Sequence, residues 1–154
     1  MNIRPFVPAD TDAVVQLWRD CELVKPWNDP HQDIARKLAV SPELFLVGEL
    51  TSQGVTTLIA SAMFGYEGHR GWVNYLAVAP AFQRQGLAAQ LMAAGEAHLL
   101  ARGCPKINLQ VRSSNLGVIA MYEKLGYTQD AVISLGKRLV ADPVQIPSRT
   151  TPCI

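Results

Sequence analysis

One junction, at residues 76–100, constrains the fold of this chain more than any other part of its sequence. An apolar stretch ending at residues 76–78 is followed by Pro80, and then by Gln-Arg-Gln-Gly-Leu-Ala at residues 83–88. The first turn of a helix carries backbone N–H groups without a partner in the helix, and the helix dipole adds partial positive charge there. Small residues let an anion approach closely. The sequence therefore predicts a strand, a turn and a helix whose first turn holds phosphate through the main chain.

Two common phosphate-binding motifs are absent from this turn. It lacks the Gly-x-x-x-x-Gly-Lys-Ser/Thr pattern of P-loop nucleotidases, and it lacks Gly-x-Gly-x-x-Gly. It also follows the fourth expected strand rather than the first, with no acidic residue placed to bind a ribose about 20 residues later. A dinucleotide site is therefore a poor fit. Taken alone, Gln-x-x-Gly-x-Ala is equally compatible with an ordinary strand-to-helix loop, because short glycine motifs are common by chance.

The overall charge and the cysteines exclude several classes of protein. The chain has 154 residues and a formal net charge of +1, which allows one domain with its own core and argues against nucleic acid or an anionic membrane as the main partner. It has no apolar run long enough to span a bilayer and no signal-peptide core at its start, so we expect a cytoplasmic protein. The Cys residues show no Cys-x-x-Cys spacing, so we expect free thiols. The His residues have no ligand partners at useful spacing, so we expect no metal site. These residues are Cys21, Cys104, Cys153, His31 and His98.

Turn signals and apolar periodicity divide the chain into strands and helices. Asp29 is a good N-cap and Pro30 suits the first helical position, so a short helix should begin there. Gly103 and Pro105 end the helix that follows the phosphate turn. The expected elements are strands at 2–6, 45–50, 55–66, 72–78, 106–112 and one or two within 127–139, and helices at 11–21, 30–39, 86–102 and 115–125.

These elements predict a single α/β (α+β) domain over residues 1–140. In order they read β-α-α-β-β-β-α-β-α-β, with room for one further strand. We expect strands two to four to form an antiparallel meander, and strand four, helix three and strand five to make a right-handed βαβ crossover. The result is a mixed, mostly antiparallel sheet of six to seven strands with four helices. Residues 141–154 hold three prolines and no periodicity, so we expect a loosely ordered C-terminal tail.

A second informative segment lies at residues 115–127, Asn-Leu-Gly-Val-Ile-Ala-Met-Tyr-Glu-Lys-Leu-Gly-Tyr. Asn115 can cap a helix, Gly126 can end it, and Tyr122 shares one face with apolar residues at helical spacing. On these observations alone, Tyr122 is a half-buried core tyrosine whose hydroxyl bonds a carbonyl. Tyr122 becomes a candidate for chemistry only in combination with the phosphate turn.

Together the two segments resemble the GNAT superfamily of acetyl-CoA-dependent N-acetyltransferases. The family's pyrophosphate signature, Arg/Gln-x-x-Gly-x-Gly/Ala, is similar to residues 83–88, and its later Asn-x-x-Ala-x-x-Leu-Tyr-Glu-Lys-x-Gly-Phe pattern is similar to residues 115–127. Val118 and Met121 replace the family's Ala and Leu and keep the apolar character. The resemblance covers about residues 2–139, including the element order. Four shorter segments look like bacterial acetyltransferases that are named by family alone, at residues 26–30, 68–71, 101–106 and 135–139.

The resemblance implies that acetyl-CoA lies in a V-shaped gap where strands four and five part. Its pantetheine arm would pair with the backbone of strand four as an added strand does. Its pyrophosphate would sit on main-chain N–H groups, and the Arg84 side chain would either add charge or remain a solvated surface group. The cofactor-binding residues that the resemblance implies are Leu76, Ala77, Val78, Gln83, Arg84, Gln85, Gly86, Leu87, Ala88, Ala89, Asn115 and Tyr122.

The resemblance also implies direct attack of a primary amine on the thioester in a ternary complex. Holding both reactants together removes much of the entropic cost of the reaction. An N–H of Leu76 or Val78 would stabilise the oxyanion, and Tyr122 would act as general acid toward the departing thiolate. A phenol of pKa about 10 stays protonated at neutral pH and is not far from a thiol of pKa about 8.5.

The general base and the acceptor site are less sharply defined. The fourth strand carries no carboxylate near its centre, so Glu67 or His69 in the preceding turn would act as base, directly or through water. In such a turn, each is more often simply a solvated group. Trp27 is either a wall of the acceptor pocket or a cover of the core. The residues expected to contact the acceptor are Trp27, Asn28, Glu67 and Asn74.

An acetyl-CoA-dependent N-acetyltransferase is thus the leading hypothesis. A non-catalytic CoA-binding sensor or scaffold fits the phosphate turn equally well, and an enzyme that uses longer acyl chains is a third interpretation. The acceptor, an amine-bearing small molecule, peptide or protein, follows neither from the near-neutral charge nor from fold analogy. An exposed last strand could pair with a second copy, so a monomer and a homodimer are both compatible with the sequence.

Overall fold

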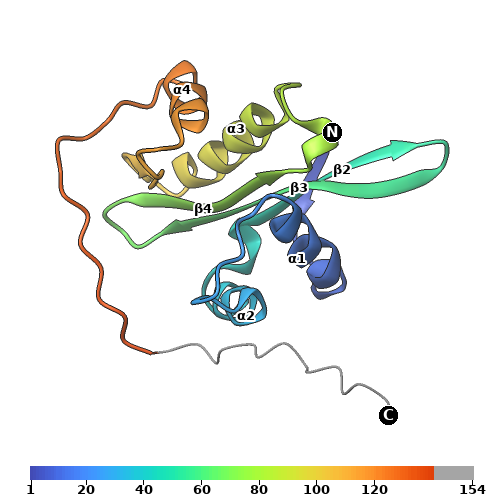
Figure 1. The fold of residues 1–154 in the computed structure, drawn as a ribbon, viewed down its shortest axis with the longest axis horizontal. Coiled ribbons are helices and arrows are strands. Elements are labelled where there is room, and N and C mark those ends of the chain that lie inside the picture. The colour runs from blue at the N-terminus through green and yellow to red at the C-terminus, as the bar shows by residue number, and fades with distance from the viewer. Residues whose placement is uncertain (141–154) are drawn as a thin grey trace, which may run out of the picture.

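The computed structural model describes residues 1–140, and the C-terminal tail expected at 141–154 lies outside them. The described residues form a five-stranded sheet in the order β1-β2-β3-β4-β5. The strands are β1 (Asn2–Pro5), β2 (Phe45–Ser52), β3 (Val55–Tyr66), β4 (Gly71–Val78) and β5 (Ile107–Asn108), and the α-helices are α1 (Thr11–Asp20), α2 (Pro30–Val40), α3 (Leu87–Leu100) and α4 (Leu116–Lys124). Figure 1 shows α1 and α2 on one face of the sheet, and α3 and α4 on the other.

Local sequence signals set the beginnings of α2 and α4 as expected. The Asp29 side chain accepts a hydrogen bond from the backbone N–H of His31 at 2.9 Å, and Pro30 occupies the first helical position of α2. The Asn115 side chain accepts a hydrogen bond from the N–H of Val118 at the start of α4. These polar side chains satisfy backbone donors that a helix leaves without partners in its first turn.

The sheet separates two apolar clusters. The cluster on the α3 and α4 face includes Phe64, Val73 and Tyr122. The cluster on the α1 and α2 face includes Trp18, which is fully buried and whose ring N–H donates to the hydroxyl of Ser61 at 2.8 Å. Because apolar side chains pack on both faces, β3 and β4 form a rigid platform between the two helix pairs.

An irregularity in β4 shifts its register against β3. Ser61 pairs with Ala77 and Met63 pairs with Asn74, so two residues of β4 lie opposite one residue of β3. Within this irregularity Tyr75 has a φ of +54°, a left-handed conformation that non-glycine residues seldom adopt. The feature is a β-bulge, which bends a strand and re-aims a side chain.

The parallel pair of β4 and β5 is short. Gly71 pairs with Ile107 and Trp72 with Asn108, so the strand expected at 106–112 is a two-residue strand. β4 continues to Val78, and along residues 73–78 it has no ladder partner on the β5 side within the described chain. The two strands therefore part after Trp72 and leave a stretch of open sheet edge on β4.

The expectation of six to seven strands is wrong, because no strand forms between residues 127 and 140. The chain instead leaves α4 and runs along the outside of the molecule (Figure 1), with Ile133 89% and Leu135 91% exposed. A strand needs a neighbouring backbone to pair with, and the short β5 offers very little of one. This segment meets the β5 region through side chains such as the ion pair of Lys106 with Asp130.

Candidate functional site

The turn between β4 and α3 has the geometry of an anion-binding site. Arg84 has a φ of +62° and Gly86 a φ of +76°, and α3 begins directly after Gly86. Left-handed residues in such a turn aim successive N–H groups at one concavity, and the first N–H groups of α3 extend that set. Residues 83–86 are exposed, and a Cβ added at Gly86 would meet no atom within 4 Å. Gly86 therefore faces open space.

Gln83 attaches this turn to the end of β4. Its side-chain amide donates a hydrogen bond to the carbonyl of Val78 at 2.9 Å, across the 3-10 turn Pro80–Phe82. The Gln83 side chain therefore contacts the backbone at the end of β4. The backbone N–H groups at the start of the helix belong to residues 84–89. Of the residues that the sequence analysis assigned to the cofactor, one apolar cluster contains Leu76, Val78, Leu87, Ala88 and Tyr122.

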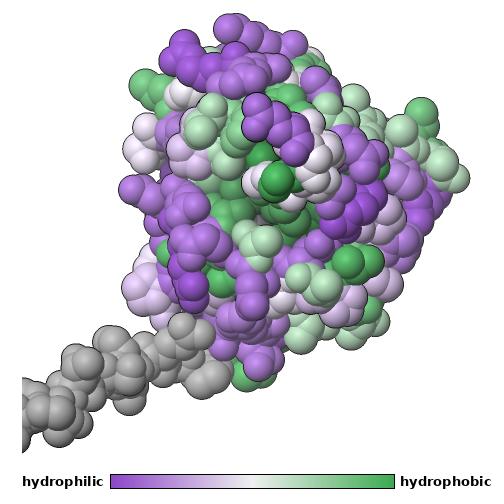
Figure 2. All heavy atoms as spheres, turned by 90° about the vertical axis from the view of Figure 1, so that its right-hand side faces the viewer, coloured by the Kyte–Doolittle hydropathy of each residue, from purple (hydrophilic) through white to green (hydrophobic). Residues whose placement is uncertain are grey.

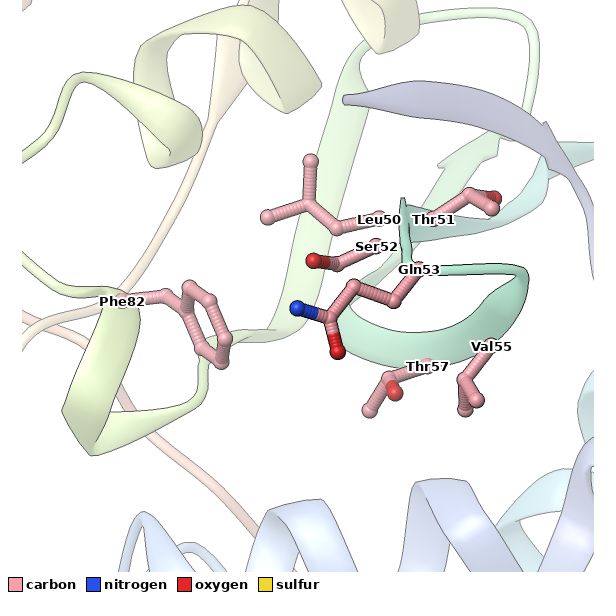
Figure 3. Close-up of a pocket in the computed structure, with 7 residues that line it drawn as sticks. All are labelled: Leu50, Thr51, Ser52, Gln53, Val55, Thr57 and Phe82. Atoms are coloured by element: carbon pink, nitrogen blue, oxygen red, sulfur yellow. The ribbon is translucent and has the colours of Figure 1, made fainter.

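A hollow lies next to the turn, between the β2–β3 hairpin and the 3-10 turn. It has a volume of about 540 Å³ and is lined by Leu50, Thr51, Ser52, Gln53, Val55, Thr57 and Phe82. Figure 3 shows Phe82 facing the hairpin side chains across the opening, and Figure 2 shows an apolar hollow at the centre of the face seen from the right of Figure 1. The sequence analysis missed this hollow because its lining comes from two remote segments that carry no motif.

Tyr122 lies in α4, against the face of the sheet that borders the open edge of β4. Its side chain is 8% exposed, it belongs to the same apolar cluster as Val73 and Val78, and its ring meets Tyr127 edge-on at 5.4 Å between centroids. Burial raises the pKa of Tyr122 to about 12. No hydrogen bond from another residue of 1–140 contributes to that rise, so the carbonyl partner that a structural tyrosine would use is not seen in the described chain.

The turn between β3 and β4 holds Glu67 and His69, at the end of β4 remote from the phosphate turn (Figure 1). The two carboxylate oxygens of Glu67 accept hydrogen bonds from the backbone N–H groups of His69 at 2.6 Å and of Arg70 at 2.9 Å. Both hydrogen bonds lower the pKa of Glu67, and the bond from His69 has the larger effect. Glu67 thus closes its own turn. Neither Glu67 nor Tyr122 contributes to the pKa shift of the other.

The expected acceptor residues fall in three places, of which the β3–β4 turn with Glu67 is one. Trp27 and Asn28 lie in the connection between α1 and α2, where Trp27 is 53% exposed and the Asn28 Oδ1 accepts from Arg138 at 3.1 Å. Asn74 is exposed and lies at the bulge of β4. A ring as exposed as that of Trp27 does not cover the core.

Two side chains at the bulge were not found from the sequence. The Tyr75 hydroxyl donates to Asp33 Oδ2 at 2.6 Å, and the Tyr75 ring stacks on Trp18 with centroids 4.0 Å apart. Nothing in residues 71–78 predicts a left-handed residue in the middle of the strand, so the face on which Tyr75 lies could not be read from the alternation of side chains.

Residues 1–140 contain no cluster of three or more His, Cys, Asp or Glu side chains that could hold a metal ion. No helix in the same range is both long and apolar enough to cross a membrane. Cys21 and Cys104 are free thiols, and Cys153 lies outside the described residues.

The sequence matches the acetyltransferase (GNAT) family over residues 11–127, a range that includes the phosphate turn and α4. The chain belongs to the GNAT acetyltransferase family. GNAT relatives include an acetyltransferase of Yersinia enterocolitica, 49% identical over 142 residues, and one of Sodalis glossinidius, 50% identical over 143 residues; each match covers 92% of this chain and 98% of the relative. A relative from Yersinia pestis is called an uncharacterized N-acetyltransferase, so these names supply no acceptor.

Solved structures show the same GNAT fold. The ribosomal-protein-S18-alanine N-acetyltransferase of Escherichia coli is 28% identical with a TM-score of 0.67, over 84% of this chain and 78% of that chain. Ard1 of Thermoplasma volcanium is 24% identical with a TM-score of 0.72, over 84% of each chain. The NatB acetyltransferase complex, 23% identical with a TM-score of 0.71 over 83% of this chain and 84% of that chain, was solved bound to CoA. The α/β fold with a mixed sheet and four helices is therefore that of the GNAT family, whose members use acetyl-CoA.

Proposed function

We propose that this GNAT protein transfers the acetyl group of acetyl-CoA to a primary amine by direct attack in a ternary complex. The observation that carries the proposal is the exposed turn at residues 84–86, where two left-handed residues meet the start of α3 beside the open edge of β4. A flexible, anionic cofactor needs main-chain donors for its diphosphate and an unpaired strand edge for its amide-bearing arm. Consecutive segments of this chain offer both.

The cofactor follows these two features. The pantetheine arm pairs with the backbone of residues 76–78, and the diphosphate accepts hydrogen bonds from N–H groups of residues 84–89. Gln83 supports the turn through its bond to Val78, and Arg84 adds positive charge from its exposed side chain. Asn115 caps α4 and so fixes the helix that carries the proposed acid.

Tyr122 stabilises the departing sulfur in this proposal. With a pKa of about 12 against about 8.5 for a thiol, complete proton transfer to the thiolate is uphill by about 5 kcal/mol at 1.36 kcal/mol per pKa unit. A hydrogen bond donated from the neutral phenol needs no such transfer, and it strengthens as negative charge develops on sulfur. An N–H of Leu76 or Val78 stabilises the oxyanion on the other side of the reacting carbon.

The base in this proposal is His69 or a water molecule. Glu67 uses both carboxylate oxygens to close its turn, and its lowered pKa makes it a weaker proton acceptor. His69 lies in the same exposed turn, and the Arg70 guanidinium reaches its Nδ1 at 3.5 Å, so Nε2 is the ring nitrogen that would accept the proton. A water that relays the proton from the amine to solvent requires no side chain at all.

The test combines calorimetric titration of CoA with an assay of thiol release from acetyl-CoA in the presence of a panel of primary amines. The proposal predicts CoA binding and amine-dependent thiol release, with the acetylated amine identified by mass spectrometry. CoA binding without transfer to any amine would instead indicate a sensor or scaffold module. Faster turnover with succinyl-CoA or longer thioesters than with acetyl-CoA would indicate another acyl donor.

The setting of the reaction belongs to the same proposal. We infer a bacterial, cytoplasmic enzyme, since the curated relatives are bacterial acetyltransferases and acetyl-CoA is a cytoplasmic metabolite. The acceptor is an amine on a small molecule, a peptide or a protein. Nucleic acid and membranes are not partners, and the active unit is a monomer or a homodimer, which sedimentation of the purified chain distinguishes.

A further inference from the structure

The bulge in β4 changes the face on which Tyr75 lies. In a regular strand Tyr75 would share a face with Val73, because successive side chains alternate. Val73 belongs to the apolar cluster beneath α3 and α4, whereas Tyr75 packs against the cluster beneath α1 and α2. The left-handed φ of +54° at Tyr75 accompanies this change. A non-glycine residue in that conformation costs of order 1–3 kcal/mol and persists where the surrounding structure holds it in place.

The surroundings of Tyr75 hold its ring and its hydroxyl. The ring stacks on Trp18 at 4.0 Å between centroids with an interplanar angle of 18°, and Trp18 is fully buried and bonded to Ser61. The hydroxyl donates to Asp33 Oδ2 at 2.6 Å. The carboxylate of Asp33 is therefore fixed in position from the side of the sheet, although it belongs to α2.

This carboxylate is accessible and has a replaceable partner. The Asp33 side chain keeps 21% of its surface exposed, and its Oδ1 pairs with Arg36 one turn along α2 at 3.0 Å. The Arg36 side chain in that pair is 52% exposed. An exposed pair of this kind on a helix contributes little to stability, so a cationic ligand can take the place of Arg36 at little cost.

The location connects Asp33 with the reacting centre. Tyr75 directly precedes Leu76, at the stretch of β4 where the proposed function places the thioester, while Tyr122 lies on the opposite face of the sheet. The phenol ring separates Asp33 from the β4 backbone by the length of a tyrosine side chain. An amine that attacks at the backbone therefore presents the remainder of its own molecule, rather than its reacting nitrogen, to Asp33.

We propose that Asp33 and Tyr75 form a binding site for a second positive charge on the acceptor, so that the preferred acceptors are diamines or polyamines. This inference rests on the proposed function and names its acceptor class. Asp33 is a specificity-determining residue, and Tyr75 positions it.

Two pairs of matched acceptors test this site. Pentylamine and 1,5-diaminopentane have the same carbon chain and the same reacting group, and differ in the distal ammonium. A peptide pair, with norleucine or lysine after the same N-terminal residue, asks the same question of an α-amine. We expect the wild type to prefer 1,5-diaminopentane by at least about tenfold in kcat/KM, which corresponds to about 1.4 kcal/mol.

The variants are Asp33→Asn, which removes the charge and keeps the shape, and Tyr75→Phe, which keeps the charge and frees the carboxylate. We expect Asp33→Asn to bring the preference for the diamine close to one, through KM, and to leave kcat/KM for pentylamine and the affinity for CoA within about twofold. Tyr75→Phe should retain part of the preference. Asp20→Asn is the matched control, since Asp20 is an exposed residue of α1 that bonds Gln16.

The outcomes separate the two proposals. Acetylation of both amines with no preference in the wild type, or with a preference that Asp33→Asn leaves intact, overturns the inference alone. An equal loss for both amines in Asp33→Asn assigns the pair a structural role and also overturns it. If the wild type binds CoA and acetylates neither amine pair nor any other primary amine, the proposed function itself fails.

Discussion

Replacement of Tyr122 by phenylalanine separates chemistry from packing at this site. The hydroxyl lies in a side chain that is 8% exposed, with a pKa raised to about 12 by burial. Phenylalanine preserves the ring and its edge-on contact with Tyr127, and it removes a hydroxyl that is not among the buried polar atoms left without a partner in residues 1–140. The free energy of unfolding should therefore change by less than about 1 kcal/mol. A structural tyrosine with a bonded hydroxyl would lose stability instead.

The loss in turnover follows from the bond that the hydroxyl makes to sulfur. A hydrogen bond to a charged group is worth about 1.5–3 kcal/mol, which corresponds to a decrease in kcat of about 10- to 150-fold at 1.36 kcal/mol per factor of ten. Thiol release measures kcat, and calorimetry should show the affinity for CoA within about twofold of the wild type. The rate should also show no decrease from ionisation of Tyr122 up to pH 10, since its pKa is about 12.

Tyr66→Phe is the matched control, because the Tyr66 hydroxyl bonds the carbonyl of Gly68 in the β3–β4 turn, away from the proposed sulfur. Because Gly68 precedes His69, a candidate base in the same turn, this control should change kcat by no more than about twofold, well below the effect of Tyr122→Phe. Unchanged kcat in Tyr122→Phe, or equal losses of kcat and of CoA affinity, would refute the reasoning about Tyr122.

Three further predictions concern the turn, the core and the response to acid. Gly86→Val forces a β-branched residue into a φ of +76°, at a cost of about 1–2 kcal/mol. Calorimetry should show that this variant binds CoA about tenfold more weakly. Gly86→Asn should retain most of the affinity, because asparagine tolerates this conformation. Gly95→Ala places a Cβ against the buried Phe64 ring, closer than atoms can approach, and denaturant unfolding should show a loss of about 1–3 kcal/mol. Unaltered stability would mean that the ring can move aside. The hydrogen bonds from Arg4 lower the pKa of Asp10, so this contribution to stability is present above the unfolded pKa of about 3.9 and is lost as the pH falls through the lower folded value. Asp10→Asn should flatten that acid limb in unfolding measurements from pH 5 to 2, and an unchanged limb would contradict the assignment.

Local signals in the sequence were sufficient where the structure depends on local chemistry. Asp29 and Pro30 predicted the start of α2, because capping involves neighbouring backbone groups. The residues around Gly86 predicted a turn followed by a helix, and α3 begins directly after Gly86. These features place the phosphate turn, which is the part of the site that the sequence described in most detail.

The remaining features depend on contacts between distant segments. The apolar alternation near Ile133 predicted a strand, but a strand also requires a partner edge, and β5 provides two paired residues. The face of Tyr75 depends on a bulge whose register is set against β3. Its partner Asp33 comes from a helix more than forty positions earlier in the chain, and no local pattern links the two.

A crystal structure of the protein with acetyl-CoA tests the central claim most directly. The account predicts that the diphosphate oxygens lie within hydrogen-bonding distance of backbone N–H groups of residues 84–89, and that the sulfur lies beside the Tyr122 hydroxyl. A diphosphate bound at any other surface of the molecule, with that turn left empty, would contradict it.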